Sequence, residues 1–516
     1  MPAHPIIVAI VASGLVASVG CDANPAATPR GIDEPLRVLI PRDVEQLDPR
    51  HVADAWSLRT TRLLFASLVA MDGDRLEPYP DLAETIDSID SRRWRIRLRP
   101  GLRFSDGSTL DAADVVATYR SVIDPALGSR YAGTYRRIVR IAAEDDRTVL
   151  FELDGPHATF VTDLELPIVR AEDAARRIGT GTSPVIGAGP FVLVSRRPGR
   201  IELAANPRWH GGRPLVARVV LEAVRDDNTR ALRLLADRGD LVVGALPPLL
   251  VPLFETRPGF RVRTAPGIGT TYLGFNLDAP VLSDVRVRRA IAHALDRHAL
   301  VDAELAARGR PARGLLPPGH WAAIDDLPVP EYDPAAARAL LQRTGALHAE
   351  LTLRCASDRT RVSTARAIAA MLARVGLRIR VRPSDGATLI AEMDRGRFEI
   401  ALLSLPEMYE PHLLSWFFGS DRIPAPGRAG ANRWRLRDPV IDESLERGRI
   451  GLERDERRAA YAIVQRRLVE QLPVVPLWHE DVVLVAREPH AHLMPPRDGR
   501  LSFLARRGAD PPPEVP

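Results

Sequence analysis

The stretch WRIRLRPGLRFSDG, residues 94–107, with LDAADV at residues 110–115 just after it, decides the fold of this chain. Apolar residues alternate with arginine at its start, which predicts a strand with one buried face; the apolar positions are Trp94, Ile96 and Leu98. Pro100-Gly101 marks a turn. Asp111, with Asp114 three residues later, predicts the capped start of a helix.

Strand and helix signals alternate along the rest of the chain, which indicates an α/β fold with mixed sheets flanked by helices. Apolar spacing predicts one helix over residues 283–306, another over 362–375 and a third over 455–471. A strand is expected over 377–381. Cys355 follows an alternating segment, so it is expected near a strand end, packed in the core.

The composition limits the classes of function. The chain has 516 residues, of which 45% are hydrophobic and 27% charged, and its net charge is +5. This length is sufficient for two or three domains. All 71 basic residues are arginine, so a phosphate-binding GxxxxGK[ST] loop and Schiff-base chemistry are both excluded. The arginines alternate with 66 acidic residues and form no basic stripe with aromatics, so no nucleic-acid partner is expected.

The N-terminal segment resembles an export signal. Residues 6–20 are uncharged and apolar but too few to span a bilayer comfortably. They end in Ser18-Val19-Gly20-Cys21, which is similar to a lipoprotein cleavage box. We therefore expect a signal peptide over 1–21, a lipid on Cys21 that anchors the protein outside the cytoplasm (periplasmic), and a tether over 22–31. Plain secretion is the alternative.

The chain offers little for covalent or metal chemistry. Cys21 and Cys355 are its only cysteines, so lipidation of the first leaves no disulfide and no cysteine metal cluster. The sequence has neither a GxSxG nor an HExxH motif; His479-Glu480 lacks the second histidine. No catalytic residue, metal or cofactor is assigned, and the protein is not expected to be an enzyme.

A series of motifs resembles the bacterial extracellular solute-binding proteins of family 5, the peptide and nickel receptors of ABC importers. The series includes the stretch quoted above and covers roughly residues 36–505. Its members, in chain order, are 82–84, 94–107, 110–115, 187–191 (GAGPF), 206–214 (NPRWHGGRP), 272–276 (YLGFN), 284–297, 332–334, 396–400 and 472–478 (LPVVPLW).

The resemblance implies a two-lobed periplasmic-binding-protein clamp of type II with an extra subdomain. The first lobe is expected over 32–70, 186–266 and 475–510, the subdomain over 71–185 and the second lobe over 267–474. Two strands are expected to cross between the lobes, near 267–275 and 474–483. Narrow crossings of this kind allow hinge closure on a ligand.

The resemblance also implies a ligand site between the lobes. In peptide-binding members an acidic residue grips the ammonium of the ligand, and the motif alignment puts Glu407 at this position, with glutamate replacing aspartate. An ordinary carboxylate at the rim is the alternative for Glu407. Further residues that are either cleft contacts or core aromatics and amides are Tyr272, Asn276, Tyr409, Trp416, Trp434 and Trp478.

The expected function is that of an extracytoplasmic lipoprotein that closes on a peptide-like ligand and delivers it to an ABC permease with its ATPase subunits. A monomer is expected. Within the family, a receptor for a metal chelate, a sugar or another small molecule is the alternative. A surface receptor or chaperone-like lipoprotein without a dedicated importer is a further one.

Overall fold

The computed structural model describes residues 34–179, 184–405, 407–428 and 430–506. Contacts divide the chain into Met1–Glu34 and Pro35–Pro516. Glu34 is the only described residue of the first unit, so the predicted signal peptide, Cys21 and the tether lie outside the described residues. All that follows concerns the second unit.

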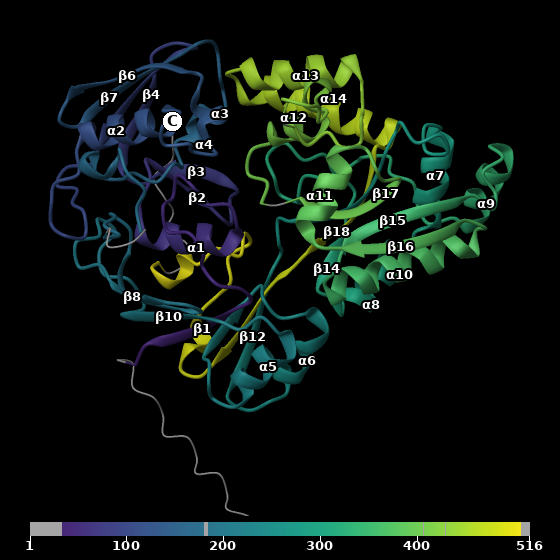
Figure 1. The fold of residues 1–516 in the computed structure, drawn as a ribbon, viewed down its shortest axis with the longest axis horizontal. Coiled ribbons are helices and arrows are strands. Elements are labelled where there is room, and N and C mark those ends of the chain that lie inside the picture. The colour runs from purple at the N-terminus through teal and green to yellow at the C-terminus, as the bar shows by residue number, and fades with distance from the viewer. Residues whose placement is uncertain (1–33, 180–183, 406, 429, 507–516) are drawn as a thin grey trace, which may run out of the picture. The chain divides into compact units, whose positions relative to one another are not determined.

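The helices of the described residues alternate with strands, as the sequence predicts (Figure 1). They are α1 (Ala55–Leu64), α2 (Ala112–Ile123), α3 (Ala132–Tyr135), α4 (Phe160–Asp163), α5 (Asp227–Leu235), α6 (Pro252–Glu255), α7 (Val285–Ala294), α8 (Arg297–Leu305), α9 (Pro334–Arg343), α10 (Arg359–Arg374), α11 (Gly386–Asp394), α12 (Leu413–Phe418), α13 (Pro439–Ile450) and α14 (Arg454–Gln471). Short 3-10 turns lie at Ala171–Asp173, Pro248–Leu250, Ser420–Arg422, His490–His492 and Ser502–Leu504.

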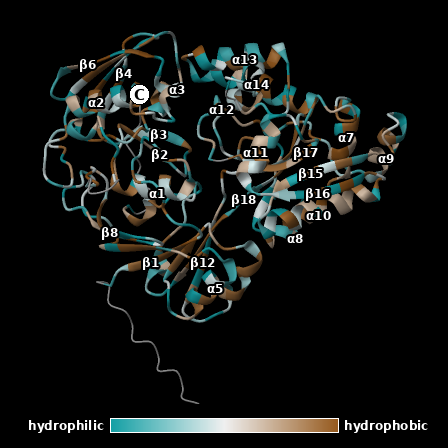
Figure 2. Cartoon of the chain, in the orientation of Figure 1, coloured by the Kyte–Doolittle hydropathy of each residue, from teal (hydrophilic) through white to brown (hydrophobic). Residues whose placement is uncertain are grey.

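The first lobe contains a seven-stranded sheet in the order β12-β19-β11-β1-β10-β9-β8. Central β1 pairs in parallel with β10 and β11, and the other pairs are antiparallel. Figure 2 shows hydrophobic residues along strands of this sheet, such as β8 and β12. The strands are β1 (Leu36–Ile40), β8 (Phe191–Arg197), β9 (Arg200–Ala205), β10 (Arg218–Ala223), β11 (Leu241–Val243), β12 (Phe260–Ala265) and β19 (Val482–Arg487).

The second lobe contains a six-stranded sheet in the order β14-β18-β13-β17-β15-β16. Helix α10 packs along β15 and β16, and Cys355 is fully buried on β15 (Figure 1). The strands are β13 (Thr270–Phe275), β14 (Gly309–Pro311), β15 (Glu350–Ala356), β16 (Arg378–Ser384), β17 (Ile400–Leu405) and β18 (Val474–Glu480).

A smaller subdomain carries the stretch that decides the fold. Its antiparallel sheet has the order β4-β5-β7-β6, and a β2–β3 hairpin lies beside it in sequence. On β5 the apolar residues are buried and Arg95 and Arg97 are exposed, which confirms the predicted strand. Asp111 and Asp114 form the predicted capping box of α2. The strands are β2 (Val69–Asp72), β3 (Glu77–Pro80), β4 (Ala83–Ser88), β5 (Arg93–Leu98), β6 (Ile138–Asp145) and β7 (Thr148–Leu153).

The chain passes between the two large sheets twice. It leaves β12 at Ala265 and enters β13 at Thr270, and it returns from β18 to β19 at Asp481. Because β18 pairs with β13 and β14, residues 475–480 lie in the sheet of the second lobe. The return at Asp481 lies within the crossing that the resemblance implies near 474–483. The paired crossings are what a hinge requires.

One predicted helix is wrong. Residues 283–306 form two helices, α7 and α8, instead of one. The chain is extended at Leu295, and the Asp296 side chain accepts a hydrogen bond from the Ala299 backbone N–H at 2.9 Å. Asp296 is therefore the cap of a new helix, which competes with continuation of the first one. The other two predicted helices are confirmed as α10 and α14.

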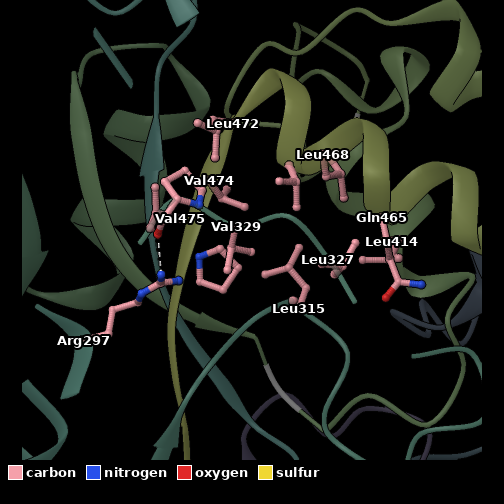
Figure 3. Close-up of a pocket in the computed structure, with 14 residues that line it drawn as sticks. Arg297, Leu315, Leu327, Val329, Leu414, Gln465, Leu468, Leu472, Val474 and Val475 are labelled. Atoms are coloured by element: carbon pink, nitrogen blue, oxygen red, sulfur yellow. Dashed lines mark hydrogen bonds between the residues drawn. The ribbon is translucent and has the colours of Figure 1, made fainter. Parts of the chain in front are cut away.

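A small cavity lies within the second lobe, beside α14 and β18 (Figure 3). Its volume is about 30 Å³, and its lining is mostly aliphatic, including Leu315, Leu327, Leu468 and Val475. Arg297 at its edge donates a hydrogen bond to the Pro330 carbonyl. A cavity of this size holds a water molecule or two, so it is a packing defect and not a ligand site.

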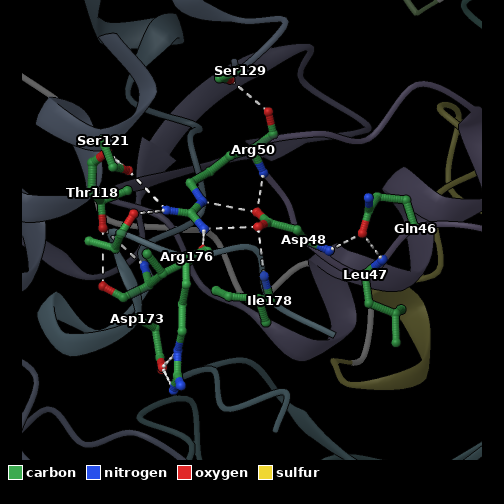
Figure 4. Close-up of polar contacts among 12 residues, drawn as sticks. Gln46, Leu47, Asp48, Arg50, Thr118, Ser121, Ser129, Asp173, Arg176 and Ile178 are labelled. Carbon is green, nitrogen blue, oxygen red and sulfur yellow. Dashed lines mark hydrogen bonds and ion pairs between the residues drawn. The ribbon is translucent and has the colours of Figure 1, made fainter. Parts of the chain in front are cut away.

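A buried ion pair within the loop after β1 is hydrogen-bonded to the subdomain (Figure 4). Arg50 and Asp48 are both 0% exposed, and the guanidinium binds both carboxylate oxygens, at 2.9 and 2.8 Å. The remaining donors of Arg50 reach the Ser121 hydroxyl on α2 and the carbonyl of Ala174. The network thus fixes the loop after β1 against the subdomain.

No helix among the described residues is both long enough and apolar enough to cross a lipid bilayer.

Candidate functional site

The lobes meet around a group of charged and polar side chains that we name the interlobe cluster. Its members come from segments far apart in the sequence, and each large unit of the fold contributes. They are Arg59 and Arg62 on α1, Glu165 after α4, Glu407 and Tyr409 after β17, and Asp498 and Arg500 near the C-terminus.

Glu407 reaches from the second lobe to arginines of the first. Its Oε2 atom accepts a hydrogen bond from Arg500 Nε at 3.0 Å and lies 3.7 Å from Arg62 Nη1. Its other oxygen, Oε1, accepts no hydrogen bond from a described residue. The side chain is 24% exposed. One carboxylate oxygen is therefore held between the lobes while the other remains able to accept a donor.

Arg500 is the buried centre of the cluster. It pairs with Glu165, with Glu407 and, at 3.2 Å, with Asp498, and it lies over the Tyr409 ring at 4.7 Å. Burial opposes the charged form of Arg500, but the surrounding carboxylates raise its pKa above the ordinary value. Burial would raise the pKa of Glu165, and the charges of Arg500 and Arg62 instead lower it. These groups are therefore ionised at neutral pH.

Tyr409 makes a second polar contact between the lobes. Its hydroxyl donates to Asp498 Oδ2, while its backbone carbonyl accepts a hydrogen bond from His320 Nε2 at 3.0 Å. The ring packs with Met71, Leu76 and Ile268. Burial raises the pKa of Asp498, and the nearby Glu407 charge raises it further. The contact thus places a carboxyl group with weakened acidity beside the Glu407 carboxylate.

Further contacts join the second lobe to the subdomain and to the β2–β3 hairpin. Arg449 on α13 donates to the Pro156 carbonyl at 2.8 Å and accepts from the Ala158 N–H at 2.9 Å. Arg454 on α14 pairs with Glu77 on β3. The second lobe therefore contacts the first lobe, the subdomain and the hairpin at several points, as in a closed clamp.

A surface pocket of about 350 Å³ lies on the second lobe near Arg454. Its lining is polar and includes His320, Trp321, Asp325 and Arg458. The lining contains two arginines and two aspartates, so it presents no single charge to a ligand. Among the described residues, no three or more His, Cys, Asp or Glu side chains are grouped to hold a metal ion.

The structure brings two of the predicted contact residues together, Glu407 and Tyr409. The others lie within the second lobe. Tyr272 and Trp434 pack edge to face at 5.5 Å, and both are buried. Asn276 donates to the carbonyls of Gly396 and Phe398.

Two tryptophans complete the predicted set. Trp478 is buried in the core of the second lobe, 2% exposed. Trp416 is 38% exposed and lies under Arg422 at 5.4 Å. Ligand contact stays a prediction for all five of these residues. Packing accounts for the Tyr272 ring and backbone hydrogen bonding for Asn276. The indole N–H groups of Trp434 and Trp478 are buried without an acceptor among the described residues.

Sequence reasoning missed most of the interlobe cluster. Arg59, Arg62, Glu165, Asp498 and Arg500 stand in no motif quoted above, and Arg500 is 93 residues from its partner Glu407. One signal was present: Arg59 and Arg62 are three apart on a helix that Asp54 caps, so they share one face. Their partners depend on how the lobes pack.

Two curated relatives are similar to this chain over most of its length. Protein XP55 of Streptomyces lividans is 30% identical over 472 residues, covering 86% of this chain and 84% of that protein. Di/tripeptide-binding protein 2 of Pseudomonas aeruginosa is 28% identical over 477 residues, covering 84% and 87%.

Solved structures have the same fold. The ABC transporter substrate-binding protein CtaP of Listeria monocytogenes superposes with a TM-score of 0.81 at 22% identity, covering 90% of this chain and 98% of that one. NikA of Brucella suis, in complex with Fe(III)-EDTA, gives a TM-score of 0.81 at 21% identity, covering 92% and 99%.

Two lobes joined by paired crossings define the class of clamp-like solute-binding proteins. The family model for bacterial extracellular solute-binding proteins, family 5 Middle, matches residues 77–422, which is more than half of the chain. The chain belongs to this family, as the sequence motifs predict.

Proposed function

We propose that this protein is the extracytoplasmic substrate-binding component of an ABC importer, which closes on a peptide-like ligand and delivers it to a membrane permease. The observation that supports this most directly is Glu407. It stands at the motif position of the ammonium-binding residue, projects between the lobes and keeps Oε1 open to a donor. The names of relatives, such as the di/tripeptide-binding protein, agree with this.

The chemistry of the site suits an amine. An ammonium group can donate to Glu407 Oε1 while Arg500 continues to hold Oε2, so binding requires no loss of the interlobe pair. A charge-assisted hydrogen bond in a closed, water-poor cleft is stronger than the same contact in water. Contacts that form only when the lobes meet would couple closure to occupancy.

Native mass spectrometry of residues 22–516, purified gently, tests this proposal. We expect a heterogeneous set of short peptides to co-purify and to be released on denaturation. Glu407→Gln removes the charge at nearly constant shape and should lower retention about tenfold or more. Glu443→Gln, an exposed glutamate of α13, is the matched control.

The outcomes separate the alternatives. One defined metal chelate or sugar in place of peptides would contradict the peptide assignment and favour another small solute. NikA in its complex with Fe(III)-EDTA shows that this fold accommodates such a ligand. Unchanged retention in Glu407→Gln would remove Glu407 from the site.

We also propose that Cys21 carries a lipid anchor and that the protein acts as a monomer outside the cytoplasm. Metabolic labelling with a fatty acid should mark the wild-type protein and leave Cys21→Ser unlabelled. Adjacent genes for two permeases and two ATPases would support a dedicated importer, whereas an isolated gene would favour a receptor without one.

A further inference from the structure

Two buried N–H groups on α1 have no hydrogen-bond acceptor among the described residues. They are Nε of Arg59 and Nη1 of Arg62. Arg59 donates no hydrogen bond to any described residue, and its guanidinium lies over the Trp56 ring at 4.8 Å. Arg62 Nη1 is 3.7 Å from Glu407 Oε2, within ion-pair range but too long for a hydrogen bond.

Buried donors without acceptors are rare in folded proteins, and each one calls for an explanation. Other such donors occur elsewhere among the described residues. These two are distinguished because they lie three residues apart on one helix face, at the meeting point of the lobes. Arginine stays charged in proteins, so deprotonation does not relieve the cost. Burial lowers the pKa of Arg59, and the Glu407 and Asp498 charges only partly oppose this effect. A ligand anion bound at this helix face would supply the hydrogen-bond acceptors that the described residues do not provide.

The third arginine of the cluster is not available in the same way. Arg500 is already paired with Glu165, Glu407 and Asp498. Arg62 donates to Glu165 through Nη2 at 2.9 Å, which leaves its Nη1 group open. The open donors therefore belong to α1, and the open acceptor belongs to Glu407. Arg62 Nη1 lies 3.7 Å from Oε2 of the same carboxylate, and the Glu407 charge acts on Arg59.

We propose that Arg59 and Arg62 bind a carboxylate of the ligand that is separated by only a few bonds from the amine held by Glu407. The proposal rests on the proposed function and narrows it to amino-carboxylate ligands. A peptide with an acidic first residue has this chemistry, and so does a ligand that ends in a free α-amino-acid group. A planar guanidinium recognises a carboxylate through paired hydrogen bonds, which an amide cannot reproduce.

Titration calorimetry on residues 22–516 tests the proposal with synthetic peptides. Asp-Ala-Ala presents an acidic first residue, γ-glutamyl-Ala-Ala presents a free α-amino-acid group, and Asn-Ala-Ala is the neutral comparator. We expect at least one of the acidic peptides to bind about tenfold or more tightly than Asn-Ala-Ala. Which one does so distinguishes the two sources of the carboxylate.

Variants of Arg59 link this preference to α1. In Arg59→Gln the affinity ratio between acidic and neutral peptide should fall toward one, and Arg59→Lys should restore part of it. Arg257→Gln, an exposed arginine of the first lobe, should keep the full ratio. Thermal melting of each variant confirms that it folds.

Three results would overturn the proposal, in two different ways. Equal affinity for acidic and neutral peptides, or a ratio that Arg59→Gln leaves intact, overturns the carboxylate site while the peptide-receptor function stands. Absence of binding by all three peptides to the wild-type protein overturns the peptide-like function and the carboxylate site together.

Discussion

Arg50 is one of the largest side chains that the described part of the protein buries completely. Its burial is compatible with stability because Asp48, Ser121 and backbone carbonyls take its hydrogen bonds. Removing either member of such a pair leaves an uncompensated buried charge, which commonly costs about 3–5 kcal/mol. Through the hydrogen bonds of Arg50 to Ser121 and to the Ala174 carbonyl, the pair fixes the loop after β1 in the first lobe to the subdomain.

Acid should weaken the stabilisation that the Asp48–Arg50 pair provides. Burial would raise the pKa of Asp48, but the hydrogen bonds and charge of Arg50 and the Ile178 N–H lower it below the ordinary value of 3.8. The folded protein thus keeps this carboxylate ionised more firmly than the unfolded chain does. Its contribution is complete above pH 3.8 and is lost as the pH falls through the lower pKa of the folded state.

Urea unfolding between about pH 5 and pH 2 checks this expectation. The free energy of unfolding should fall with acidification in the wild-type protein and fall less steeply in Asp48→Asn. Asp302→Asn, an exposed aspartate of α8, should retain the wild-type slope. Identical slopes for wild type and Asp48→Asn would contradict the role of this carboxylate.

At the scale of single elements, β13 depends on a glycine. A Cβ atom at Gly274 would lie 2.1 Å from a ring carbon of Trp434, which is fully buried. We expect Gly274→Ala to destabilise the second lobe by about 1–3 kcal/mol, because neither the strand nor the indole can move without repacking the core.

Thermal melting and near-ultraviolet circular dichroism measure this effect, because the near-ultraviolet signal of a buried tryptophan such as Trp434 changes when its packing changes. Gly269→Ala is the matched control, because the nearest atom to a Cβ there is the Leu405 carbonyl oxygen at 3.6 Å. Equal melting temperatures for the two variants would contradict the close approach at Gly274.

The elements also show where sequence reasoning succeeds. Strand β5 and the cap of α2 were predictable because alternation and capping depend only on neighbouring residues. The break between α7 and α8 was missed, because the apolar stripe continues through it and Asp296 alone marks the new start. Whether a helix continues or a new cap ends it depends on tertiary packing, which cannot be read from the local sequence.

At the scale of the whole molecule, Tyr409 is expected to favour the closed state. Its hydroxyl bonds Asp498 across the lobes. Tyr409→Phe removes this bond and should leave the cores intact, so the unliganded protein should open more often and bind ligand about tenfold more weakly.

Small-angle scattering measures the opening as an increased radius of gyration, and calorimetry measures the affinity. Tyr332→Phe, an exposed tyrosine, is the control. If neither quantity changes in Tyr409→Phe, the contact does not contribute to closure.

Only part of the candidate site could be predicted from the sequence. Glu407 and Tyr409 follow a strand inside a recognisable motif series, so their neighbourhood was predictable. Their partners Arg500 and Asp498 lie about ninety residues further along the chain and meet them only because the paired crossings bring the lobes together. No local pattern encodes such a pairing.

The rate at which the Cys355 thiol is modified reports how often the second lobe opens. Cys355 is fully buried on β15, and burial raises the pKa of its thiol. In a protein that begins at residue 22 it is the sole sulfhydryl, so a thiol-specific reagent reacts only when this sheet opens. The labelling rate thus measures how often this lobe opens, without an engineered probe. A bound ligand that stabilises the folded lobe will lower the labelling rate.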